Sequence, residues 1–210
     1  LGDAAADVPL ANPSLVTGSG RIGIGAQGLP TELQATRLAL AAQEVAIRDT
    51  TLTSEFSQGL DQAVVVRAGN LSIENSQLSL QNSGGSDSGG VTLEAETVSL
   101  SESSLETLAL SEGDAGGFAI LADQLSLVGA SVSSTTRGAG NAGLVSVAAS
   151  TVAFSDGSLL ASQAGIGSSG KAGDVVITAG SLSIDGSIVS SSTFGEGDGG
   201  LVSVLAEDVG

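Results

Sequence analysis

Hydrophobic residues recur along most of the chain with one repeating spacing. In residues 140–159 the apolar residues Val145, Val147, Val152, Phe154 and Leu159 follow one another at steps of two, five, two and five. A step of two places neighbours on one face of a β-strand, and a step of five leaves enough chain to turn a corner. Each period therefore predicts one coil of three short strands.

The same spacing returns at a nearly constant interval. The first strands of successive periods begin at Leu38, Val64, Val91, Phe118, Val145, Val175 and Val202, which gives intervals of 26, 27, 27, 27, 30 and 27 residues. We therefore expect six complete coils and a truncated seventh over residues 38–210, belonging to a longer chain.

Residues 1–37 follow the spacing less well. Val8, Leu10 and Leu15, and then Ile22, Ile24 and Leu29, repeat the steps of two and five, but Pro9, Pro13 and Pro30 interrupt them. Proline disfavours the interior of a sheet. We expect irregular or partial coils in this segment.

A solenoid of about 27 residues per coil predicts an all-β, parallel β-helix. The alternatives are a helical solenoid and a flat β-sandwich. Short runs of alternation and an excess of β-branched residues disfavour helices, and hairpins would not produce a constant step. The general rule for parallel crossovers predicts a right-handed coil.

The corners are also regular. One alanine follows each first strand and indicates a crowded inner corner: Ala42, Ala68, Ala95, Ala122, Ala149, Ala179 and Ala206. The second corner carries residues that tolerate turns, namely Asp49, Asn75, Glu102, Gly129, Asp156 and Gly186. The next position is always small: Thr50, Ser76, Ser103, Ala130, Gly157 and Ser187.

In the third strand, a second inward position predicts a partly polar wall with a ladder of hydroxyls: Ser54, Leu80, Thr107, Ser134, Ala161 and Ser191.

Two further columns precede the first strands. The glycine column, two residues before each strand, comprises Gly89, Gly116, Gly143, Gly173 and Gly200, and the Asx column, four residues before, comprises Asp87, Asp114, Asn141, Lys171 and Asp198. Stacked carboxylate and amide oxygens suit a structural calcium ion, with Asp87, Asp114, Asn141 and Asp198 as ligands. Asx side chains also cap turns, and Lys171 interrupts the column, so turn capping is the favoured interpretation and calcium the alternative.

Composition narrows the function. The chain has no Cys, Met, Trp, Tyr or His, and its 23 acidic against six basic residues give a formal charge of −17. This charge disfavours nucleic acid and anionic membranes as partners. No signal peptide is evident, and no apolar run is long enough to span a bilayer.

Catalysis has few candidates. Without His or Cys, nucleophilic triads and transition-metal sites are excluded. Asp174, Lys171 and Arg137 would be the group to act on a polysaccharide, although so acidic a chain would repel an acidic polymer. The glycine-rich segments 84–90 and 195–200 lack the Gly-Lys-Ser/Thr of a phosphate loop.

The hydroxyl runs 133–136 and 190–193 suggest either a solvated strand surface or a flat face for glycans or ice. We expect no enzyme, no catalytic residue and no cofactor.

The repeats resemble those of filamentous-haemagglutinin-like exoproteins, and most of all the large cyanobacterial versions. The resemblance rests on Gly140-Asn141-Ala142-Gly143 with Val145-Ser146-Val147, and on the segment from Ser190 to Gly200, and it extends over residues 38–210. It implies a right-handed β-helix exported by two-partner secretion through an outer-membrane transporter, and located on the bacterial surface or secreted. Asn12-Pro13-Ser14-Leu15 only faintly matches the secretion domain of that family.

Three functions follow as hypotheses. The first is an adhesin or surface scaffold whose partners are glycans or proteins of a cell surface or matrix. The second is a subunit that associates end to end into a filament, and the third is a polysaccharide-active enzyme.

Overall fold

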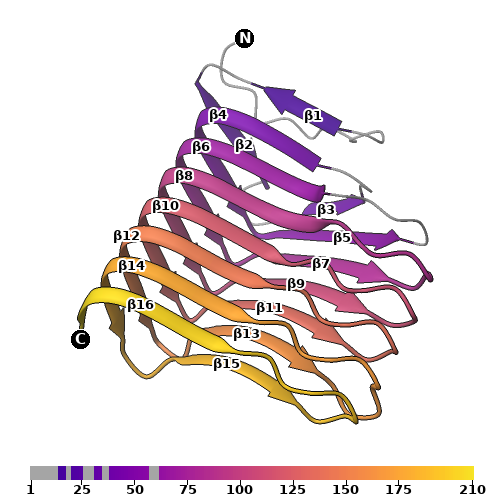
Figure 1. The fold of residues 1–210 in the computed structure, drawn as a ribbon. Coiled ribbons are helices and arrows are strands. Elements are labelled where there is room, and N and C mark those ends of the chain that lie inside the picture. Colours follow the sequence, from indigo (N-terminus) through magenta and orange to yellow (C-terminus); the bar gives the residue numbers. More distant parts are fainter. Residues whose placement is uncertain (1–13, 18–19, 26–30, 35–37, 57–61) are drawn as a thin grey trace.

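The chain folds as a parallel β-helix. The computed structural model describes residues 14–17, 20–25, 31–34, 38–56 and 62–210, and no helix occurs among them. Successive coils stack in chain order, each hydrogen-bonded to the next (Figure 1). The expected fold class is therefore confirmed, with about six coils of roughly 27 residues.

Each regular coil contains one long and one short strand. The long strands are β4 (Leu38–Arg48), β6 (Gln62–Glu74), β8 (Gly90–Ser101), β10 (Phe118–Val128), β12 (Val145–Ser155), β14 (Val175–Ile184) and β16 (Val202–Val209). The short strands are β5 (Thr50–Phe56), β7 (Gln77–Asn82), β9 (Ser104–Ala109), β11 (Ser131–Thr136), β13 (Leu159–Ala164) and β15 (Ile188–Thr193). Long strands pair only with long strands and short with short, always in parallel.

Each long strand joins the first two expected strands across a bend. The alanine column runs in register from Ala42 to Ala206, and the residue after each alanine is skipped in the pairing, as Asp123 and Ser150 are between β10 and β12. The chain therefore turns there without interrupting the strand. In Figure 1 each long ribbon bends sharply at this point, on the side of the solenoid opposite the loops that follow the short strands.

The core consists of stacked aliphatic columns with two phenylalanines. In β12 the inward residues Val145, Val147, Val152 and Phe154 are at most 2% exposed. Their partners in β10 and β14 are also buried, except Ile184, which is partly buried. Burying one such side chain contributes about 1.5–3 kcal/mol. Because every coil repeats the same inward positions, the core is continuous along the axis.

In the coil that begins at Val145, the sequence spacing predicted the wrong inward leucine. Leu160, and not Leu159, lies in register with Val132 and Val189 and is completely buried. The turn here contains both Asp156 and Gly157 at positive φ, one residue more than the neighbouring coils. Consequently Ser158 and Ser162 occupy the small and hydroxyl positions that were expected for Gly157 and Ala161.

The N-terminal segment forms a coil whose corners are longer than expected. β1 (Ser14–Thr17) and β2 (Arg21–Ile24) both pair with β4, and β3 (Thr31–Gln34) pairs with β5. From Arg21 to Thr31 is ten residues, whereas their partners Glu44 and Thr50 are six apart.

Leu15 lies in register with Ala39 on the first side of this coil, and Ile22 and Ile24 lie in register with Val45 and Ile47 on the second side. Val8, Leu10 and Leu29 fall outside the described residues.

Candidate functional site

The glycine column is a backbone-to-backbone contact between coils. A Cβ placed on Gly116, Gly173 or Gly200 would lie 2.2–2.3 Å from the carbonyl oxygen of the preceding glycine in the column. At Gly143 it would lie 2.5 Å from the amide nitrogen of Gly117. The absence of a side chain at these glycines therefore allows the coils to stack closely.

A buried hydroxyl column faces the glycine column from the short strands. Ser134 Oγ donates to the Gly116 carbonyl at 2.9 Å and accepts the amide of Gly143 at 2.7 Å. Ser162 makes the same pair of bonds with Gly143 and Gly173, and Ser191 with Gly173 and Gly200. Thr107 Oγ1 also donates to Gly116. The expected polar wall therefore exists, but its hydroxyls bond to the glycine backbone and not to one another.

Two members of the column differ from this scheme. Ser54 is buried and its Oγ has no hydrogen-bond partner among the described residues. Leu80 replaces the hydroxyl with an aliphatic side chain that is 1% exposed. Thr107 only donates, since the Gly116 amide donates to Ser88 Oγ, so the full hydroxyl bridge between coils is observed from Ser134 onward.

The side chains of the Asx column bond from coil to coil. Asp87 Oδ1 accepts the amide of Asp114 at 3.1 Å, Asp114 Oδ1 accepts the amide of Asn141 at 2.6 Å, and Asn141 Oδ1 accepts the amide of Lys171 at 3.0 Å. Lys171 Nζ lies 2.8 Å from Asp198 Oδ2. These side chains therefore bond to the backbone of the next coil, whereas the side chain of an Asx turn bonds to the backbone two residues further along its own turn. In the part of the chain that the structure describes, no group of three acidic side chains is arranged to hold a metal ion.

The three residues considered for polysaccharide chemistry have separate bonding partners. Lys171 pairs with Asp198, and Asp174 Oδ1 accepts the amide of Leu201 at 2.8 Å. The Arg137 amide donates to the carbonyl of Ala109 within the coil stack. Within the described chain, no hydrogen bond or ion pair joins these three side chains to one another.

The glycine-rich and hydroxyl-rich segments are also part of the coil stack. Gly84 and Gly195 each donate their amide to the side chain two residues earlier, Asn82 and Thr193. Strand alternation sends Ser134 and Thr136 of the first hydroxyl run inward, where both are fully buried. The run therefore divides between the interior and the surface and does not form one flat hydroxyl face.

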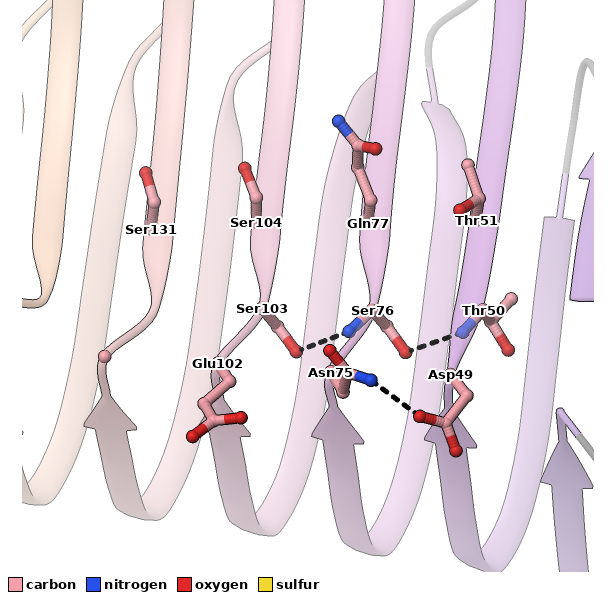
Figure 2. A pocket seen from close by; sticks show the side chains of 11 residues that line it. Asp49, Thr50, Thr51, Asn75, Ser76, Gln77, Glu102, Ser103, Ser104 and Ser131 are labelled. Atoms are coloured by element: carbon pink, nitrogen blue, oxygen red, sulfur yellow. Dashed lines mark hydrogen bonds between the residues drawn. The ribbon is translucent and has the colours of Figure 1, made fainter. Parts of the chain in front are cut away.

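A shallow groove lined largely by polar residues runs along the second corner. It is lined by residues 49–51, 75–77 and 102–104, together with Gly129 and Ser131, from four consecutive coils. Figure 2 shows Asp49, Asn75 and Glu102 along one side and the row from Thr51 to Ser131 along the other. The groove therefore runs parallel to the solenoid axis and repeats with each coil.

The floor of this second-corner groove is fixed by hydrogen bonds. Ser76 Oγ donates to the carbonyl of Glu74 at 2.8 Å, which closes the corner, and accepts the amide of Thr50 at 3.2 Å. Ser103 repeats both contacts one coil later. Positive φ values of 45–49° at Asp49, Asn75 and Glu102 direct their side chains outward.

The row that borders the groove on the short strands was not identified from the sequence. Thr51, Gln77, Ser104 and Ser131 follow the floor residues and lie in register. Their side chains make no hydrogen bond within the described residues. Each of these residues lies two positions after the corner residue with positive φ, and this fixed spacing could have identified the row from the sequence.

Ion pairs on the surface also join adjacent coils. Arg21, Arg48, Arg67 and Lys171 pair with Glu44, Glu74, Glu94 and Asp198 at 2.8–3.1 Å. The bidentate hydrogen bonds from Arg48, followed by one from Ser72, lower the pKa of Glu74, and Glu74 in turn raises the pKa of Arg48. The hydrogen bond with Lys171 likewise lowers the pKa of Asp198 and raises that of Lys171. Each shift favours the charged form.

Comparison with known proteins gives no match: no family model, no curated protein and no solved structure is significantly similar to this chain. In the described segments there is also no helix of the length and apolar character needed to cross a membrane.

Proposed function

We propose that this chain is a segment of a non-enzymatic β-helix rod that serves as an adhesin or scaffold at a bacterial surface. The observation that carries the proposal is the unbroken register of the columns. From Leu38 to Val209 the long strands pair residue for residue, except at the bend and at one irregularity between Gln62 and Val64. Such stacking makes each coil dependent on its neighbours and gives an extended, stiff body.

The distribution of polar groups supports a structural role. The hydroxyl and Asx columns bond to the backbone of adjacent coils, and the four ion pairs join the side chains of adjacent coils at the surface. These groups stabilise the rod.

The resemblance of the repeats to filamentous-haemagglutinin-like exoproteins supports the location. It favours export through an outer-membrane transporter by two-partner secretion and exposure on the outer surface. Protease treatment of intact cells tests this location: the rod should be shaved from the surface without lysis, and protection of the whole protein would contradict it.

Binding without turnover tests the adhesin proposal against the enzyme alternative. The purified protein, immobilised and probed with matrix proteins and a glycan array, should retain partners and release no new reducing ends or unsaturated sugars. Measurable cleavage of any retained polysaccharide would replace the proposal with the enzyme.

A further inference from the structure

We propose that the second-corner groove binds an extended polysaccharide without acidic groups, laid along the solenoid axis. This inference rests on the proposed adhesin function and names its ligand class and site. The four coils that line the groove lie about 4.8 Å apart, so it is about 14 Å long between the first and the last.

The first reason is that one side of the groove offers side chains without internal partners. Thr51, Gln77, Ser104 and Ser131 stand in register on the short strands, and no hydrogen bond within the described chain occupies them. Figure 2 shows their side chains pointing the same way. Because hydroxyl and amide groups both donate and accept, this row provides a regular series of bonding sites for sugar hydroxyls.

The second reason concerns the opposite side, where carboxylates dominate. Asn75 Nδ2 donates to Asp49 Oδ1 at 2.7 Å, while the exposed carboxylate of Glu102 has no partner among the described residues. Carboxylates accept hydrogen bonds from hydroxyls and attract ammonium groups, but repel uronates and sulfates. The ligand is therefore a neutral or amino-bearing polymer.

The third reason separates a polysaccharide from a peptide. Extended peptides gain most of their affinity from backbone hydrogen bonds to an open strand edge. At this corner the amides of Asp49, Asn75 and Glu102 donate to carbonyls of the next coil at 3.0–3.2 Å. The groove has no open edge to offer, so its recognition depends on side chains, which suits a polymer of hydroxyl-bearing units.

The groove is also rigid before it binds. The floor hydroxyls of Ser76 and Ser103 each donate to one carbonyl and accept one amide, and this fixes the distance between the two sides. A preformed site loses less conformational entropy on binding. A chemically repeating ligand meets a polar side chain of the row at every coil, so affinity should increase with ligand length until the groove is filled.

Calorimetric titration with defined oligosaccharides tests the inference. The probes are hexasaccharides of β-1,4-linked glucose and of β-1,4-linked glucosamine, a disaccharide of each, and oligogalacturonate as the acidic counterpart. At least one of the two hexasaccharides should bind, more tightly than its own disaccharide, and oligogalacturonate should not bind.

Matched variants locate the binding. Gln77→Ala combined with Ser104→Ala should weaken binding about 10-fold, since each lost hydrogen bond is worth about a factor of three. Gln124→Ala combined with Thr151→Ala removes the same chemistry from exposed positions of β10 and β12 outside the groove and should leave the affinity unchanged. Melting curves of both double variants check that the coil stack is intact.

Several outcomes overturn the inference. These are no binding of either hexasaccharide, equal weakening by the two double variants, or an oligolysine peptide that binds in the groove more tightly than either hexasaccharide. None of them affects the adhesin proposal itself, which the matrix and array experiments test through any face of the rod. Failure of both sets of experiments would reject the adhesin role together with the site.

Discussion

The two corners that bracket the short strands turn the chain by different physical means. At the glycine corner, formed by the glycine column, the coils approach so closely that Gly143 has no room for a Cβ. At the second corner, Asp49, Asn75 and Glu102 adopt the left-handed backbone conformation yet carry full side chains, and a Cβ on Gly186 would meet nothing within 4 Å. The glycine corner needs glycine because the neighbouring coil leaves no room for a side chain. The second corner needs only a residue that tolerates the left-handed backbone conformation.

The largest expected effect is a clash at the glycine corner. Gly143→Ala should lower the free energy of unfolding by about 3 kcal/mol or more, because the new methyl group meets backbone atoms that cannot move without breaking the ladder. Gly186→Ala is the matched control at the second corner and should cost about 1 kcal/mol, the penalty of a left-handed alanine. Chemical denaturation of both variants measures the difference, and equal losses would contradict the distinction.

The next effect removes the bridge between the glycine corner and the short strands. Ser134→Ala leaves the Gly143 amide without its partner, while the Gly116 carbonyl keeps its bond from Thr107, and should cost about 2 kcal/mol. The control Ser133→Ala, on the outward side of the same strand, should change stability by less than about 0.5 kcal/mol. A loss as large for Ser133→Ala would show that the buried bridge is not the cause.

A smaller effect is expected at the second corner. Asn75→Ala should cost about 1 kcal/mol, because alanine tolerates φ 45° poorly and the bond to Asp49 is lost. Asn75→Gly keeps the backbone conformation and should recover most of that loss. Thermal melting of the two variants decides the matter: if glycine is as destabilising as alanine, the side-chain bond and not the conformation is what matters there.

The smallest effect concerns the ion pair beside this corner. Glu74→Gln should cost about 0.5 kcal/mol at pH 7, since Arg48 and Glu74 are both roughly half exposed and solvent screens them. Because folding lowers the pKa of Glu74 below 4.5, its contribution is present above pH 4.5 and is lost as the pH falls through the folded value. Denaturation curves of the two proteins should therefore converge in acid, and a difference that grows in acid would contradict this.

Much of the second corner was predictable from residue types alone. Asp, Asn and Gly are the residues that adopt positive φ most readily, and they occupy five of the six positions that the coil spacing assigns to this corner. All six positions have positive φ, including the exception Glu102. The groove beside them was not predictable. A groove depends on how far the side chains of four coils project and on which of them lack partners, and both follow from the assembled neighbours.

The sequence revealed the column of glycines at the glycine corner, but it did not reveal that these glycines allow close contact between coils. A glycine at a fixed position suits a ligand, a tight turn or a close contact equally well in sequence. Only the stacked coils show that the neighbour of Gly173 is the carbonyl of Gly143. The same holds for the hydroxyl column, whose partners are nine or more residues away in the chain.

The sequence by itself determined the period, the inward columns and the class of fold, because strand alternation and a constant coil length are local properties that any excerpt of the repeat displays. Tertiary structure alone decided where irregular coils place their residues. Leu160 replaces Leu159 inside, and Ser162 replaces Ala161, because a coil with an extra turn residue must still align with the coils on either side. Alignment between coils maximises ladder hydrogen bonds and column packing, so the neighbours, and not the count along the chain, fix which side chain faces the core.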